Sequence, residues 1–238
     1  MLLPKAPHAP FDNHLLAALP REEYARLTPH LKLVQLPAGR ALCEVGDHIR
    51  HLYFLKDGMA SLLSITKDGH SVEVGVIGNE GVVGLSAALG VSAAPYRVIM
   101  QLPANALRIG ADALRIEFNR GGRLQKLLLH YMHTLLAQIS QSAACNRYHT
   151  TKARLCRWLL VSRDRAHTDT LQLTQEFLSQ MIGAPRPRVT LVARDLQRAG
   201  LISYSRGKIT ILDERGLEAR SCECYRIVSE QISHFMAA

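Results

Sequence analysis

The sequence predicts an α+β protein in which an N-terminal β-roll of the jelly-roll type, a long helix and a C-terminal winged helix-turn-helix follow one another. Three features predict this order. Short apolar runs alternate with glycine-bearing turns over residues 31–109, and a stretch without Pro or Gly extends from residue 123 to 146. Two short amphipathic segments and two β-branched runs then follow, up to residue 212. We expect domain boundaries at residues 1–120, 121–148 and 149–238.

The N-terminal region has the pattern of an all-β domain. Strand-like pieces occupy residues 51–55, 60–65 and 71–77, and turn signals ending in Gly58 and Gly69 separate them. Short strands with a turn about every ten residues are typical of a roll or sandwich.

The segment after Gly121 and Gly122 predicts one helix of about 25 residues, which would reach about 38 Å. Apolar residues recur along it at spacings of three and four, the pattern of a seam between helices. We interpret the stripe as a dimer interface, and packing onto the chain's own roll is the alternative. The stripe consists of Leu124, Leu128, Met132, Leu135 and Ile139.

The C-terminal region predicts two helices joined by a tight turn and followed by a hairpin. Thr174 is placed to cap the first helix, and Gly183 stands where the turn is required. The second helix covers residues 189–199, and two β-branched runs flank Arg206 and Gly207. Helix, turn, helix and hairpin in this order predict a winged helix.

Positive charge is concentrated in this last region. The chain has a formal net charge of +9, and residues 152–208 hold 11 Lys and Arg against 4 Asp and Glu. Such a concentration favours a polyanionic partner, with a merely solvated basic surface as the alternative.

The remaining composition predicts a cytoplasmic protein without a membrane partner. The sequence has five cysteines without a Cys-x-x-Cys pair, no secretory leader and no apolar run of membrane-spanning length.

Neither a metal site nor a catalytic motif is predicted. Cys222 and Cys224 are expected to point apart, so we predict neither a metal site nor a cofactor. The His-x-His motif of cupins, a Gly-x-Ser-x-Gly elbow and a P-loop are missing from the sequence, so we predict no enzyme.

Residues 36–90 and 173–212 resemble the Crp/Fnr family of bacterial transcription regulators. The match rests on the glycine placement of the first segment and on the helix-turn-helix and wing of the second. The resemblance implies a cyclic-nucleotide-binding-type roll, a dimerisation helix and a DNA-reading domain. It also implies double-stranded DNA, a second copy of the chain and RNA polymerase as partners.

The resemblance places the DNA-reading helix near Pro185, with Arg186 at a position that commonly contacts guanine. A guanidinium can donate two hydrogen bonds to guanine O6 and N7. Pro187 departs from the family pattern and suggests that helix geometry starts at Pro187, with Arg186 as the cap. Base contact, phosphate contact and a structural role stay open for Arg186. The expected DNA-binding residues are Thr174, Gln175, Pro185, Arg186, Arg188, Thr190, Arg194, Arg206 and Lys208.

The family's cyclic AMP site is degenerate in this chain. Family members that bind cyclic AMP use Gly-Glu for the ribose and Arg-Ser or Arg-Thr for the phosphate, whereas here Leu85 follows Gly84 and no Arg-Ser pair follows. A buried phosphate without a cation would be costly, so we expect another effector or none. The corresponding positions are Gly84, Leu85, Ser86, Pro95, Tyr96 and Arg97. The alternatives for function are a β-roll signalling or protein-interaction module without specific DNA recognition and, last, a cupin-type enzyme.

Overall fold

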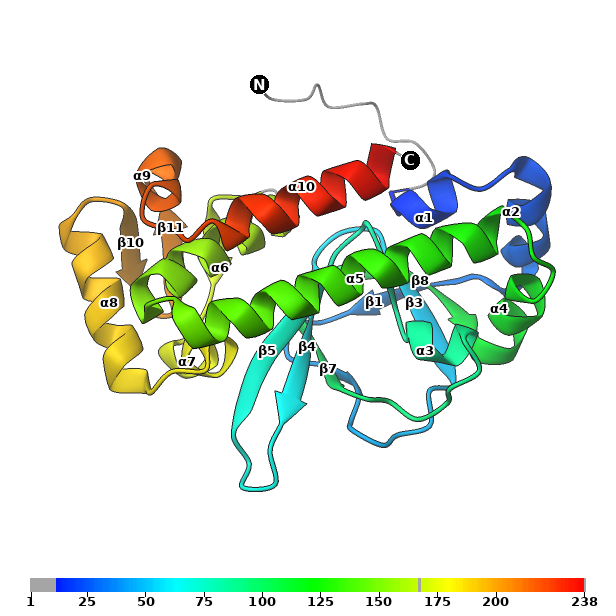
Figure 1. Ribbon diagram of the computed structural model, residues 1–238, viewed down its shortest axis with the longest axis horizontal. Helices are drawn as coiled ribbons and strands as arrows, with labels where there is room; N and C mark the ends of the chain where they lie inside the picture. The colour runs from blue at the N-terminus through cyan, green and yellow to red at the C-terminus, as the bar shows by residue number, and fades with distance from the viewer. Residues whose placement is uncertain (1–11, 167, 238) are drawn as a thin grey trace.

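The computed structural model describes residues 12–166 and 168–237. The β-roll and the DNA-binding region lie at opposite ends of an elongated molecule, and the long helix α5 (Arg123–Tyr148) runs along most of its length (Figure 1). The observed order of roll, long helix and winged helix-turn-helix confirms the predicted fold class. None of the described helices is both long and apolar enough to cross a bilayer.

Two four-stranded antiparallel sheets form the roll, and their apolar faces enclose its core. The first sheet has the order β1 (Lys32–Leu36), β8 (Ala104–Gly110), β3 (His51–Leu55) and β6 (Val82–Val83). The second has the order β2 (Ala41–Cys43), β7 (Arg97–Leu102), β4 (Met59–Ile65) and β5 (Ser71–Ile77). Fully buried Leu52, Phe54 and Met100 come from both sheets. The alternating pattern of the sequence produces this arrangement because successive side chains of a strand face opposite sides.

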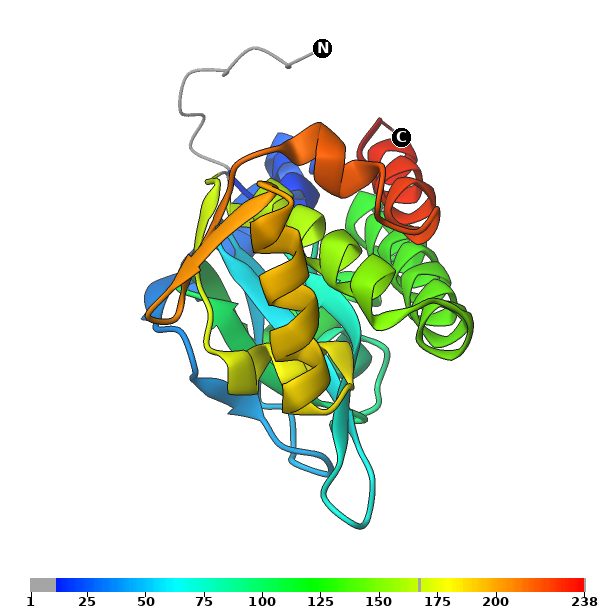
Figure 2. The ribbon, with the colours of Figure 1, turned by 90° about the vertical axis from the view of Figure 1, so that its left-hand side faces the viewer.

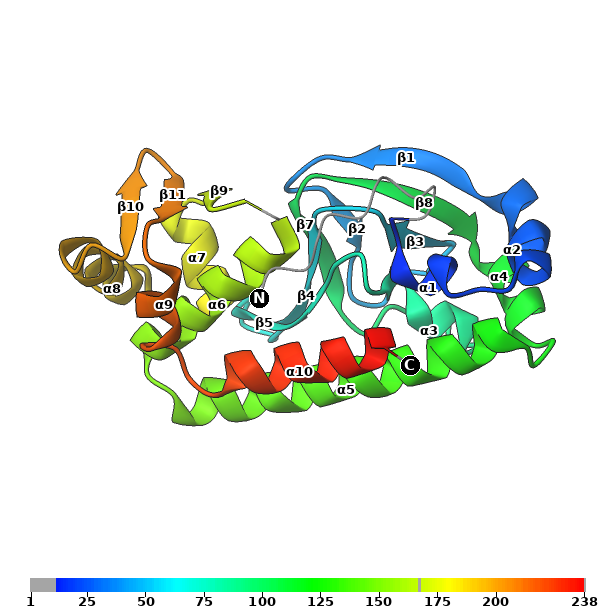
Figure 3. The same ribbon diagram turned by 90° about the horizontal axis from the view of Figure 1, so that it is seen from above.

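Short helices close the roll at the end from which α5 begins (Figure 3). They are α1 (His14–Ala17), α2 (Arg21–Leu27), a 3-10 turn (Thr28–His30), α3 (Leu85–Ala88) and α4 (Ala111–Phe118). Glu23 of α2 caps the N-terminus of α5, because its carboxylate accepts the backbone N–H groups of Arg123 and Leu124, each at 2.8 Å. A carboxylate stabilises a helix N-terminus, where backbone donors lack partners.

Three faces of α5 have different surroundings. Leu124, Leu128 and Tyr131 are buried in the core of the roll. Leu124 and Leu128 therefore lie inside their own protomer, and the prediction that these two belong to a dimer surface is wrong. Leu135 and Ile139 are partly buried against the same core, and Met132 is exposed.

The second face of α5 is covered by α10 (Cys224–Ala237), which runs antiparallel beside it (Figures 1 and 3). The ring of Phe235 near the end of α10 packs on Tyr131 of α5, with ring centroids 5.7 Å apart. The C-terminal segment thus returns to the long helix after the wing.

The C-terminal domain has its own core around α6 (Thr151–Ala166). Its remaining elements are β9 (Thr170–Gln172), α7 (Gln175–Ile182), α8 (Arg186–Arg198), β10 (Ile202–Ser205), β11 (Lys208–Ile211) and α9 (Glu214–Glu218). The three strands form one sheet in the order β10-β11-β9. Leu155 and Leu159 of α6 are fully buried with Leu178 of α7 and Leu196 of α8.

A buried polar network joins the roll to this domain. Trp158 of α6 donates from Nε1 to Glu73 Oε1 on β5 at 3.0 Å. Ser61 Oγ lies 2.7 Å from Glu73 Oε2 and 2.6 Å from Gln101 Oε1. The Ser61 hydroxyl has one proton and can therefore donate only one hydrogen bond. If it donates to Gln101, its bond with Glu73 requires that the Glu73 carboxyl carries a proton and donates to Ser61. Burial raises the pKa of Glu73 to about 7, although hydrogen bonds from Ser61 and Trp158 and the charge of Arg157 act in the opposite direction.

Candidate nucleic-acid interface and ligand pocket

The two helices of the helix-turn-helix are α7 and α8. Thr174 caps α7 as the sequence predicted, since its Oγ1 accepts from the backbone N–H of Phe177 at 3.1 Å. Gly183 ends α7 at φ +60°, and a Cβ at this glycine would come within 2.8 Å of Val72 Cγ2. Both the left-handed backbone and the close approach of β5 require glycine at this turn.

The second helix, α8, lies at the outer end of the molecule, where Figure 2 shows it at the front. It begins at Arg186, with Pro185 as its N-cap. The expectation that Pro187 is the first helical residue and Arg186 the cap is therefore wrong by one position. The first turn of a helix accepts Pro187 because its backbone N–H groups have no partner within the helix.

One side of α8 is buried and the opposite side is open to solvent. Val189, Ala193 and Leu196 pack into the domain core. The exposed residues include four arginines and one large apolar residue: Arg186, Arg188, Arg194, Arg198 and Leu191. This side of α8 therefore offers cations and an apolar contact together.

A shallow hollow of about 350 Å³ lies between the starts of α7 and α8 and the wing. Its lining includes four of the predicted DNA-binding residues: Thr174, Gln175, Arg186 and Arg206. Thr190 borders this region, with its Oγ1 2.8 Å from Gln175 Oε1 and 2.9 Å from the carbonyl oxygen of Arg186. The hydroxyl of Thr190 is thus bonded within the protein, which connects α8 to α7.

The wing is a two-residue hairpin in which Ser205 pairs with Lys208. Its turn residues Arg206 and Gly207 have φ values of +50° and +74°. Positive φ at both positions is the geometry of the turn that best fits antiparallel strands. Arg206 and Lys208 are exposed at this hairpin.

The sequence prediction missed two members of this surface. Leu191 is 61% exposed on α8, and Tyr204 lines the hollow beside Arg186. Burial raises the pKa of Tyr204, and the positive charge of Arg186, which lines the same hollow, opposes this rise. The available signal for Leu191 was an apolar residue on the polar face of an amphipathic helix.

A separate cavity of about 160 Å³ lies inside the roll and reaches α5. Five of the six expected pocket residues line it: Gly84, Leu85, Ser86, Pro95 and Tyr96. Met132 and Leu135 of α5 complete one side. Arg97 is not among the lining residues, and its Nε lies 3.3 Å from Glu44 Oε1. Among the described residues that line this cavity, none carries a positive charge.

Comparison with known proteins gives matches for both regions. The cyclic nucleotide-binding domain family matches residues 33–120, and the Crp-like helix-turn-helix domain family matches residues 153–220. A global nitrogen regulator from Nostoc sp. is 23% identical over 175 residues, which cover 70% of this chain and 78% of the relative.

Solved structures show the same fold. A Crp/Fnr-family protein from Eubacterium rectale has a TM-score of 0.70 at 20% identity, covering 87% of this chain and 96% of that one. The c-di-GMP-responsive global regulator CLP from Xanthomonas campestris has a TM-score of 0.68 at 16% identity, covering 82% and 100%. The roll, the helix-turn-helix and the two matched domains together identify the chain as a member of the Crp/Fnr family of transcription regulators, and not an enzyme.

Proposed function

We propose that this regulator binds DNA sequence-specifically as a homodimer, with α8 in the major groove and the wing on the phosphate backbone. The observation that carries the proposal is the exposed side of α8, which presents arginines around Leu191. Helices of this motif read base edges with their N-terminal residues. We assign base contacts to Arg186 or Arg188, and contact with a thymine methyl group to Leu191.

The remaining cations would hold the protein on the duplex. Arg206 and Lys208 of the wing, and Arg194 further along α8, are exposed and free to approach phosphates. Phosphate contacts add affinity and set the register without reading sequence. From family membership alone, we also propose that the DNA-bound protein contacts RNA polymerase. The five free cysteines fit a reducing compartment such as the cytoplasm.

Arg186→Ala or Arg188→Ala should weaken binding to the cognate fragment about 10- to 100-fold, because a bidentate contact with guanine contributes about 1–3 kcal/mol. Fluorescence anisotropy on genomic fragments, with unrelated DNA as competitor, measures this loss.

Arg206→Asn keeps the turn of the wing, because Asn accepts positive φ. This variant should weaken binding to all DNA sequences equally. It should also reduce the slope of log affinity against log salt concentration by about 0.9, because one phosphate contact is lost.

Arg40→Ala is the matched control, since Arg40 is an exposed arginine between β1 and β2 of the roll and belongs neither to the helix-turn-helix nor to the wing. Its DNA affinity should equal that of the parent. Equal, weak binding of the parent to every fragment would refute sequence-specific recognition.

We propose that the second copy packs on the third face of α5. This face carries exposed Leu129, Met132, Leu136 and Ala143, spaced by three, four and seven residues. Helical residues at these spacings form one stripe. Leu129, Leu136 and Ala143 lie apart from the side chains that enter the roll and from those beneath α10, and Met132 lies at the border, where it also lines the cavity of the roll. This stripe is therefore the part of the long helix left for a partner.

We further propose that the cavity in the roll takes an uncharged, largely apolar effector and rejects cyclic AMP. The lining offers no cation for a phosphate, and Leu85 cannot accept a hydrogen bond from a ribose hydroxyl. Because Met132 and Leu135 line the cavity, an occupant would touch the dimerisation helix directly. Thermal unfolding with millimolar cyclic AMP should leave the melting temperature unchanged, and a clear stabilisation would overturn the assignment.

A further inference from the structure

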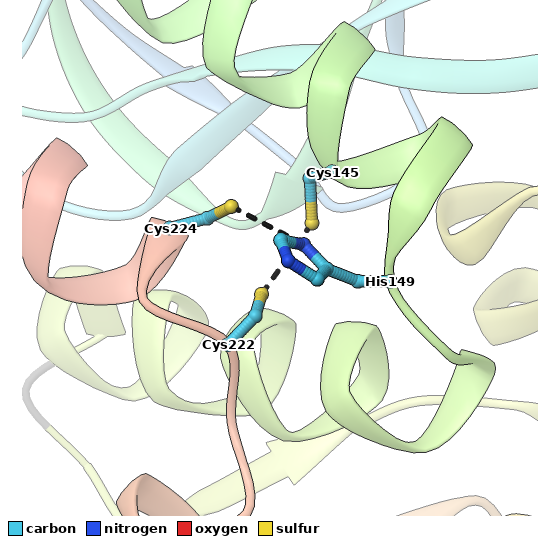
Figure 4. A group of neighbouring side chains, drawn as sticks. All are labelled: Cys145, His149, Cys222 and Cys224. Carbon is cyan, nitrogen blue, oxygen red and sulfur yellow. Dashed lines mark hydrogen bonds between the residues drawn. The ribbon is translucent and has the colours of Figure 1, made fainter.

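Three cysteines and one histidine gather where α5 ends and α10 begins. Cys145 and His149 come from the end of α5, while Cys222 comes from the link between α9 and α10 and Cys224 from the start of α10 (Figure 4). The ligand atoms of the four side chains all lie within 4.8 Å of one another. The three cysteines are buried and His149 is partly buried.

The expectation that Cys222 and Cys224 point apart is wrong. Cys222 lies in the turn before α10, and Cys224 is the first residue of that helix. The two residues thus share no regular element, and the bend of the turn directs both sulfurs towards Cys145 and His149 (Figure 4).

The separations fit a single tetrahedral ion. Cys145 Sγ lies 3.5 Å from Cys222 Sγ, and His149 Nδ1 lies 3.4 Å from Cys224 Sγ. Zinc bonds of about 2.3 Å to sulfur and about 2.0–2.1 Å to nitrogen place neighbouring ligand atoms about 3.5–3.8 Å apart. Cys145 and His149 are four residues apart, so they face the same side at the end of α5.

The groups around the cluster also fit a bound cation with thiolate ligands. Glu223 Oε1 lies 3.2 Å from His149 Nε2, so a carboxylate holds the ring with Nδ1 towards the sulfurs. Histidine ligands of metals are usually held in this way. Gln141 Nε2 donates to Cys224 Sγ at 3.0 Å.

Two arginines of α6 supply positive charge near the cluster. Three thiolates and one Zn²⁺ would leave a net charge of −1, and the positive charge of Arg154 acts on Cys145 and Cys222. Arg157 also acts on Cys145, and its buried Nε has no hydrogen-bond partner among the described residues. The two arginines thus compensate the excess negative charge.

We propose that Cys145, His149, Cys222 and Cys224 form a closed Zn²⁺ site. Four protein ligands leave no open position, which is the arrangement of a structural zinc site and not of a catalytic one. His149 is the C-cap of α5, and α6 begins two residues later. A bound ion would therefore fasten the link before α10 to the junction between the dimerisation helix and the DNA-binding domain.

The full chain, purified under reducing conditions without a polyhistidine tag or chelator, should contain about one zinc ion per chain by inductively coupled plasma mass spectrometry. Cys222→Ser, Cys224→Ser and His149→Ala should each lose most of the zinc. Cys43→Ser and Cys156→Ser are matched controls, because both cysteines lie outside the cluster, and they should retain it.

A second measurement tests the zinc site even if the variants above fail to fold. The metal-free parent, reduced and titrated with Co²⁺, should show the visible bands of tetrahedral cobalt with thiolate ligands, and Zn²⁺ should abolish them. His149→Cys should keep these bands, because a thiolate replaces the imidazole. Absence of both zinc and cobalt binding by the reduced parent would overturn the proposal. An iron–sulfur chromophore, or a Cys145–Cys222 disulfide with no metal uptake after reduction, would also overturn it.

Discussion

Leu136→Glu is expected to convert the protein into a monomer and to weaken its binding to a two-fold symmetric operator at least about 100-fold. Leu136 is 62% exposed on the solvent face of α5, in the stripe that also contains Leu129 and Met132. A dimer would bury this side chain between two helices, where an unpaired carboxylate is costly. A monomer engages one half-site at a time and loses the gain from two linked contacts.

Sedimentation velocity gives the oligomeric state and fluorescence anisotropy gives the operator affinity. Ile116→Glu is the matched control, because Ile116 is 63% exposed on α4 and lies outside the stripe. This control should remain dimeric with unchanged affinity. A dimeric Leu136→Glu protein would place the interface on another surface.

The Glu73→Gln variant is expected to be more stable than the parent above pH 7 and to lose much of the pH dependence of the contact between roll and DNA-binding domain. The folded pKa of Glu73 is about 7, against an ordinary value of 4.5. A carboxyl whose pKa is raised by folding leaves stability unchanged below pH 4.5. Its ionisation then destabilises the folded state progressively as the pH rises from 4.5 to 7. The loss is complete above pH 7 and amounts to about 3 kcal/mol.

Urea unfolding between pH 5 and 8, followed through the fluorescence of Trp158, measures this difference. Trp158 is the only tryptophan and donates to Glu73, so its emission reports on the contact itself. Glutamine can still accept from Trp158 and donate to Ser61. The gap between variant and parent should therefore open in favour of the variant as the pH rises. Parallel curves would mean that Glu73 ionises normally in the folded protein.

Local patterns were sufficient to predict the strands of the roll and the helix-turn-helix. The cap at Thr174 and the left-handed turn at Gly183 depend on residues close in sequence, and the structure contains both. The start of α8 was misplaced by one residue because Pro187 is compatible with either of the first two helical positions.

The surroundings of α5 could not be predicted in the same way. Periodicity shows which residues share a helix face, but not what covers that face. Leu124 and Leu128 follow the spacing of a helix seam and nevertheless pack in the roll. The positions of the roll and of α10 around the helix determine which face stays exposed, and this face carries Leu129 and Leu136, which we propose as part of the dimer surface.

The cysteine cluster shows the same limit over a longer distance. Cys145 and Cys222 are separated by 77 residues along the chain, and only the return of the chain after the wing brings them together. The spacing of Cys222 and Cys224 places both in one short segment but does not predict where their side chains point. That direction depends on how α9 packs against α6 and α10 against α5.

The packing of α10 along α5 also restricts how the two ends of the molecule can move. A domain that is attached through a single linker can rotate about it through wide angles. Here the chain leaves the roll through α5 and contacts it again through Phe235 of α10, so two antiparallel helices connect the roll to the DNA-binding domain. Such a pair resists bending. The proposed zinc site would also prevent the two helices from sliding past each other, because it would bind the first residue of α10, Cys224, to Cys145 near the end of α5. A signal from the roll would accordingly reach α8 as a movement of both helices together.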